Sequence, residues 1–113
     1  MEDFTKVATL SEIGPGQRKS VWVEGQQVLL INVDGTIYAM DESCPHRQCS
    51  LAKAALEGKV ITCPCHSARF DLETGAVLAQ PTRYPPTPPL PIHLVKVDKQ
   101  DVLVALGQKA DYI

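Results

Sequence analysis

The residues best suited to metal chemistry lie in two short clusters. Cys44 and His46 stand two positions apart in CPH, and sixteen residues later Cys63 and His66 stand three apart in CPCH. Each cluster therefore offers one thiolate and one imidazole. Two sulfur and two nitrogen donors suit a structural zinc site. They also suit a 2Fe–2S cluster in which two histidines replace two cysteines on one iron.

The distribution of ligand types favours the iron–sulfur cluster over zinc. A zinc finger usually takes its cysteines from one element and its histidines from a following helix. Here each cluster is mixed, and no helical pattern follows the second one. Mixed loops suit two irons, because each loop could give sulfur to one iron and nitrogen to the other. From the spacing alone, a zinc site is the alternative to the 2Fe–2S cluster.

The spacing of the cysteines also argues for a metal. All four, Cys44, Cys49, Cys63 and Cys65, fall within 22 residues of the chain and share that stretch with two histidines. A secreted disulfide scaffold spreads its cysteines along the sequence instead.

The segments around the two clusters predict β-strands. Val21–Val23 and the branched run 28–33 are strand candidates, and Asp34-Gly35 suits a tight hairpin that returns as the strand 37–40. After the clusters, residues 92–97 and 102–106 predict a second hairpin, in which the alternating sequence PIHLVKVD makes His93 a strand residue. We therefore expect an all-β fold.

The chain of 113 residues predicts one domain, residues 1–113. A compact insert at about 42–71 carries the chemistry and includes a short strand at 60–62. Residues 80–91 follow with six prolines in twelve residues, a density that predicts a rigid extended loop.

Composition excludes several classes of function. Hydrophobic residues make up 44% and charged residues 21%, as in a soluble globular protein. The net charge of −2 gives no signal for binding nucleic acid. No apolar stretch approaches the ~20 residues that span a bilayer. The beginning MEDFTKVATLSEIG lacks the pattern of a secretory signal, so we expect a cytoplasmic protein.

The two clusters resemble the signature of the Rieske iron–sulfur proteins, which is Cys-x-His followed about sixteen residues later by Cys-x-x-His. CPHRQCSL and CPCHSARFD both fit, and LETGAVL with the proline-rich loop is similar as well. The resemblance implies a small antiparallel β-sandwich or barrel with two cluster-binding loops at one tip. It assigns Cys44 and Cys63 to a buried iron, and His46 and His66 to an outer iron near the surface.

Cys49 and Cys65 match the positions of the non-ligand cysteines that form a disulfide between the two loops in high-potential members of the family. The resemblance therefore implies a bridge between Cys49 and Cys65, and two buried free thiols are the alternative. Convergence of the loops on one cluster favours the bridge, whereas a cytoplasmic location argues against it.

Two further positions depart from the high-potential members. Those proteins have a serine and a tyrosine whose hydroxyls donate to the cluster, where this chain has Ala68 and Phe70, and a glycine where it has Ser67. Without the two donors the reduced cluster is less stabilised. We therefore expect a reduction potential in the lower half of the family range, about −150 to +300 mV.

The resemblance implies a soluble Rieske-type ferredoxin, which is an electron carrier rather than an enzyme. Its partners would be a reductase and an oxygenase or similar acceptor, docking near His46 and His66. The alternative with the same cluster is a small subunit of a stable redox enzyme, of the nitrite reductase or arsenite oxidase type. A zinc-stabilised interaction module is the third possibility.

Overall fold

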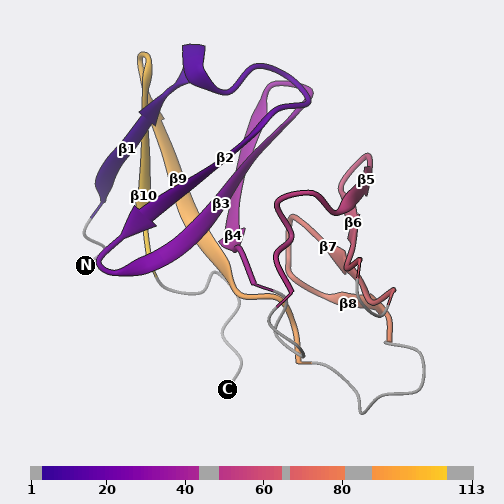
Figure 1. The fold of residues 1–113 in the computed structure, drawn as a ribbon. Coiled ribbons are helices and arrows are strands. Elements are labelled where there is room, and N and C mark those ends of the chain that lie inside the picture. Colours follow the sequence, from indigo (N-terminus) through magenta and orange to yellow (C-terminus); the bar gives the residue numbers. More distant parts are fainter. Residues whose placement is uncertain (1–3, 44–48, 65–66, 81–87, 107–113) are drawn as a thin grey trace.

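Two antiparallel sheets make up the fold in the computed structural model, which describes residues 4–43, 49–64, 67–80 and 88–106 (Figure 1). The larger sheet has six strands in the order β1-β10-β9-β4-β3-β2. These are β1 (Thr5–Thr9), β2 (Arg18–Val23), β3 (Gln26–Val33), β4 (Thr36–Asp41), β9 (Ile92–Asp98) and β10 (Asp101–Ala105). One turn of 3-10 helix, η1 (Leu10–Glu12), follows β1. The all-β expectation is confirmed.

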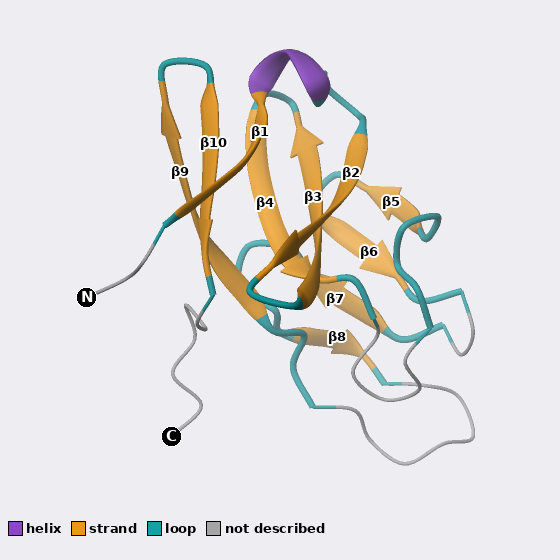
Figure 2. Ribbon diagram, turned by 60° about the vertical axis from the view of Figure 1, so that its left-hand side comes forward, coloured by secondary structure: helices purple, strands orange, loops and turns teal. Residues whose placement is uncertain are grey.

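The smaller sheet has four strands and lies beside the larger one in both views (Figures 1 and 2). Its strands, in chain order and in spatial order, are β5 (Ala55–Glu57), β6 (Val60–Thr62), β7 (Arg69–Asp71) and β8 (Val77–Ala79). This sheet carries the region expected to hold the metal, since Cys63 follows β6.

The hydrophobic core consists of two clusters of buried side chains. The larger sheet curls until its edge strands β1 and β2 approach each other, and it encloses one cluster of buried side chains. A second cluster fills the space between the two sheets. Strand β3 contributes side chains to both clusters. Val28 and Leu30 point into the first cluster. Leu29 and Ile31 alternate with them and point into the second. The smaller sheet is therefore packed directly on β3.

The predicted hairpin at Asp34-Gly35 is confirmed. Val33 pairs with Thr36, and the two turn residues have φ of 52° and 97°. Both values lie in the left-handed region that a two-residue hairpin requires, which Asp and Gly tolerate better than most residues. The hairpin sets the register of β3 against β4 and so places Asp41 at the entrance to the first ligand loop.

The predicted strands at 21–23, 60–62, 92–97 and 102–106 are found with shifts of a few residues at their ends. Strands β5 and β7 were not expected from the sequence, because each has only three residues and cannot show a clear alternation. Of the proline-rich loop 80–91, residues 81–87 lie outside the described part of the chain. Within that part, no helix has the length and apolar character that a bilayer crossing requires.

Candidate metal centre

Of the four expected metal ligands, Cys63 lies among the described residues, and Cys44, His46 and His66 lie outside them. Cys63 directly follows β6, is 1% exposed and has a free thiol. The part of the chain with described placement contains no group of three or more metal-binding side chains. The centre is therefore defined by Cys63 and by the segments that lead into and out of the two ligand loops.

The second ligand loop is closed at its base by two backbone hydrogen bonds. The N–H of Cys63 donates to the carbonyl oxygen of Ala68 at 2.8 Å, and the N–H of Ser67 donates to the carbonyl oxygen of Cys63 at 3.0 Å. Ser67 has a φ of 62°, which reverses the chain so that β7 can begin at Arg69. This position is the one where the resembling family usually has glycine. The loop therefore holds Cys63 with little freedom.

The surroundings of Cys63 are apolar. It belongs to the buried cluster between the sheets, together with Leu51, Ala68, Phe70 and Leu90. A thiolate in such surroundings is costly unless a cation binds it. The burial of Cys63 at the end of β6 therefore fits a metal–sulfur centre.

The first ligand loop leaves and rejoins the fold at one place. Ser43 and Ser50 form an isolated antiparallel bridge, and the N–H of Leu51 donates to the carbonyl oxygen of Glu42 at 2.7 Å. The side chain of Glu42 is buried, and its carboxylate accepts hydrogen bonds from the hydroxyls of Ser20 and Ser50. One carboxylate thus ties both arms of the loop base to β2.

A second polar contact lies at the point where the first ligand loop and the proline-rich loop meet the larger sheet. His93 Nε2 lies 2.7 Å from Asp41 Oδ1, which also accepts a hydrogen bond from Gln26. The N–H of Asp41 donates to the carbonyl oxygen of Pro91. His93 is 3% exposed, and its Nδ1 has no hydrogen-bond partner among the described residues. A proton on Nε2 lets the ring donate to the carboxylate of Asp41.

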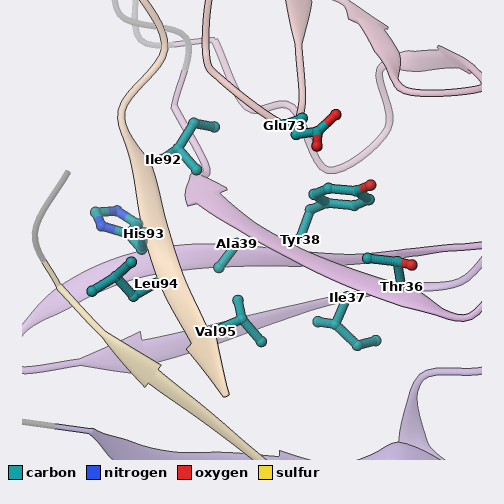
Figure 3. Close-up of a pocket in the computed structure, with 9 residues that line it drawn as sticks. All are labelled: Thr36, Ile37, Tyr38, Ala39, Glu73, Ile92, His93, Leu94 and Val95. Carbon is teal, nitrogen blue, oxygen red and sulfur yellow. The ribbon is translucent and has the colours of Figure 1, made fainter. Parts of the chain in front are cut away.

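A cavity of about 260 Å³ lies beside this contact, between β4 and β9, which pair only at Ala39–His93 and Met40–Ile92 among the described residues. Figure 3 shows Tyr38 and Glu73 on the side of β9 toward which Ile92 points, whereas the imidazole of His93 lies on its other side. The cavity is thus at the junction of the two sheets, and His93 faces the interior of the larger one.

Arg18 makes a third polar connection between the larger sheet and the metal-binding region. From β2, its guanidinium donates to the carbonyl oxygens of Leu51, Ala52 and Ala54 at 3.0, 3.0 and 2.6 Å. Burial removes water from the guanidinium and lowers the pKa of Arg18 from its ordinary value, although an arginine stays charged at neutral pH.

The end of the proline-rich loop is fixed at Gly75. The N–H of Leu90 donates to the carbonyl oxygen of Gly75 at 2.9 Å, and the N–H of Gly75 donates to that of Asp71 at 2.7 Å. Gly75 has a φ of +81°, and a β-carbon there would stand 2.1 Å from the carbonyl oxygen of Leu90. Glycine is therefore required for the two backbones to approach so closely.

The remaining predicted positions are placed as follows. Cys49 is half-buried and packs against the cluster that contains Cys63, while Cys65 lies outside the described residues. Ala68 and Phe70 are fully buried in that cluster, where neither side chain can donate a hydrogen bond.

Sequence reasoning missed the polar residues that hold the loops, namely Arg18, Glu42 and the Asp41–His93 pair. An acidic residue directly between a buried strand and the first cysteine, as in MDESC, is a usable signal for Glu42. The apolar neighbours of His93 indicate a buried histidine, which needs a polar partner. Nothing in the sequence distinguishes Arg18 from an ordinary surface cation.

Comparison with known proteins agrees with this geometry. The family model described as Rieske [2Fe-2S] domain matches residues 3–105. Over 108 residues, the chain is 33% identical to the biphenyl dioxygenase ferredoxin subunit of Pseudomonas sp. strain KKS102, covering 95% of each chain. It is 36% identical to the ferredoxin component of the naphthalene 1,2-dioxygenase system of Pseudomonas aeruginosa, covering 94% of this chain and 98% of that one.

Solved structures show the same similarity. The ferredoxin of carbazole 1,9a-dioxygenase from Nocardioides aromaticivorans IC177 superposes with a TM-score of 0.80 at 31% identity, over 92% of this chain and 98% of the other. A chain in a complex of reduced oxygenase and oxidized ferredoxin of carbazole 1,9a-dioxygenase gives the same TM-score and identity, over 98% and 100% of the two chains.

Proposed function

Because the chain belongs to the Rieske 2Fe–2S domain family, we propose that it carries single electrons from a reductase to an oxygenase or a similar acceptor. The family match and the ferredoxin relatives imply a 2Fe–2S cluster of Rieske type as its cofactor. The protein is an electron carrier of an oxidoreductase system rather than a catalytic enzyme.

The observation that carries this proposal is the extent of the match. Relatives that align over nearly their whole length with this chain are named ferredoxin subunits or components of dioxygenase systems. One solved structure with the same fold contains a ferredoxin together with its oxygenase. We propose the same class of acceptor here, with docking near His46 and His66.

We propose that Cys44 and Cys63 bind the inner iron, and that His46 and His66 bind the outer one. The burial of Cys63, the closed second loop and the tied base of the first loop support this assignment. When bound, the cluster takes up and releases one electron. Two neutral imidazoles in place of thiolates make its reduction easier, with potentials of about −150 to +300 mV against about −400 mV for plant-type clusters. The chain supplies the hydrogen-bonded bases of the two loops and the apolar surroundings of Cys63.

We also propose that Cys49 and Cys65 form a disulfide between the two loops. The support is that Cys49 packs against the buried cluster that contains Cys63, and Cys63 lies two positions before Cys65 in the second ligand loop. A crosslink of this kind typically adds about 2–4 kcal/mol of stability. Thiols counted in the denatured protein after removal of the cluster, without reductant, test the pairing. Two thiols per chain support it, and four exclude it.

Two properties of the whole chain complete the proposal. We propose that residues 1–113 form one domain, supported by the hydrophobic cluster that both sheets share. We also propose a cytoplasmic location, where the reductase and oxygenase partners would be available. Fractionation of cells that express the native gene tests the location.

The proposed function is tested by electron transfer from the reduced holoprotein. The chain is reduced anaerobically, freed of reductant and mixed with the oxidised oxygenase component of a naphthalene dioxygenase system. We expect one electron per chain to pass to the oxygenase, and none from a Cys63→Ser control that cannot hold the cluster. A chain that purifies only in a stable complex with a large catalytic subunit, and does not transfer electrons as a free protein, would favour the alternative of a redox-enzyme subunit.

A further inference from the structure

We propose that Arg18 is a positioning residue for the metal centre, which holds the first ligand loop from the neighbouring sheet and raises the reduction potential through its positive charge. The inference rests on the proposed function, because it assigns a new residue to the same centre.

Arg18 makes three hydrogen bonds to one short segment of the chain. Three carbonyl oxygens from one short segment converge on the guanidinium, with Leu51 and Ala52 on Nη1 and Ala54 on Nη2. The segment is itself a tight turn, in which the N–H of Ala54 donates to the carbonyl oxygen of Leu51 at 3.1 Å. A planar guanidinium presents several N–H groups in a fixed fork, which an ammonium group cannot reproduce.

The segment that Arg18 holds adjoins the base of the first ligand loop and packs in the cluster that contains Cys63. It begins at Leu51, whose N–H closes the base of the first ligand loop on Glu42. The side chains of Leu51 and Ala54 are buried in the same cluster as Cys63. Arg18 thus fixes the returning arm of the first loop and two side chains that are buried with Cys63. It does so from β2, a strand that is not part of the smaller sheet.

Among the described residues, no carboxylate forms an ion pair with Arg18. Its three partners are uncharged carbonyl groups, and the ion pairs between described residues join other cations to carboxylates. The side chain is partly buried, so water screens it less than an exposed cation. A positive charge stabilises the more negative, reduced state of a nearby redox centre. Removal of the charge is therefore expected to lower the potential.

Two substitutions separate position from charge. Arg18→Lys keeps the charge and loses the fork, whereas Arg18→Gln loses the charge and keeps one amide donor group. Lys19→Gln is the matched control, because it removes one positive charge at the next position of β2, whose side chain points to the opposite face of the sheet.

Each holoprotein is measured in three ways. Film voltammetry gives the reduction potential, the decay of visible absorbance gives the rate of cluster loss, and hydrogen exchange reports on the backbone amides of residues 51–54. We expect both Arg18 variants to lose the cluster about fivefold faster or more, since each lost hydrogen bond is worth about 1 kcal/mol. We expect faster exchange at 51–54 in both. The potential should fall in Arg18→Gln and stay near its original value in Arg18→Lys.

Several results would overturn the proposal. Cluster loss within about twofold of the unmodified protein in both variants would refute the positioning role, because it is less than one hydrogen bond is worth. An equal potential shift in Arg18→Gln and Lys19→Gln would refute the role of the charge. Loss of the β-sheet signal in far-UV circular dichroism in both variants would make Arg18 a general folding residue instead. Failure of the unmodified chain to assemble any 2Fe–2S cluster would count against the proposed function and is recognised before any variant is made.

Discussion

Replacement of Gly75 by alanine tests how the proline-rich loop is held over the metal-binding region. Gly75 joins two backbones, because it donates to Asp71 at the end of β7 and accepts from Leu90 at the end of the loop. Leu90 is fully buried in the cluster that contains Cys63. A change at Gly75 should therefore affect both the stability of the fold and the retention of the cluster.

The expected cost has two parts. Alanine at a φ of +81° is strained, which costs about 1–2 kcal/mol. Its β-carbon would also stand 2.1 Å from the Leu90 carbonyl oxygen and 3.0 Å from Ile92 Cγ1, so the backbone of Leu90 must withdraw. Overpacking of this kind in a well-packed core costs about 1–3 kcal/mol. Together we expect Gly75→Ala to lower the free energy of unfolding by about 3 kcal/mol.

Gly25 offers a matched control. It has the same φ of +81°, and a β-carbon there meets no atom of the described residues within 4 Å. Gly25→Ala should therefore carry the backbone strain alone, about 1–2 kcal/mol. Urea titration of both holoproteins separates the two parts, with circular dichroism following the strands and visible absorbance following the cluster. We expect Gly75→Ala, and not Gly25→Ala, to release the cluster before the strands unfold. Equal losses of stability in the two variants would refute the close approach at Leu90.

Substitutions at three further positions give separate outcomes. Ser67→Gly should raise the free energy of unfolding by up to about 1 kcal/mol in a urea titration, because Ser67 has a φ of 62°, and a clear loss would show that its side chain is needed. His93→Ala should lower the free energy of unfolding by about 3 kcal/mol, because it removes the hydrogen bond to Asp41 and leaves a cavity. His93→Gln should lower it by less, and equal effects of the two variants would contradict a stabilising role of this hydrogen bond. Phe70→Tyr supplies the hydroxyl that high-potential members have, and voltammetry should show a potential higher by about 40 mV, which corresponds to one hydrogen bond of about 1 kcal/mol. An unchanged or lower potential would contradict the explanation offered for a low-potential centre.

The strands of the larger sheet could be predicted because their signals are local. Asp34-Gly35 between two apolar runs dictates a hairpin, and the structure has it at that position. The strand 92–97 shows alternation over enough residues to be recognised. In contrast, β5 and β7 have three residues each and depend on pairing with β6, which no local pattern reveals.

The expected metal ligands could be identified from the sequence, whereas the polar residues that hold the ligand loops could not. Cysteine and histidine at fixed spacings identify a metal-binding pattern by residue type alone. Arg18 contacts Leu51, Ala52 and Ala54, which lie 33 to 36 positions further along the sequence. The acceptors are backbone carbonyl groups, which every residue has. Likewise, the meeting of Asp41 with His93 depends on how β4 and β9 pair. Such contacts follow from the tertiary fold.

The most direct test of the central claim is a redox titration of the native protein followed by electron paramagnetic resonance. We expect the oxidised protein to be silent, and one electron per chain to produce the signal of a histidine-ligated 2Fe–2S cluster at a potential within about −150 to +300 mV. A colourless protein that contains zinc, takes up no electron and gives no signal in either state would contradict the central claim.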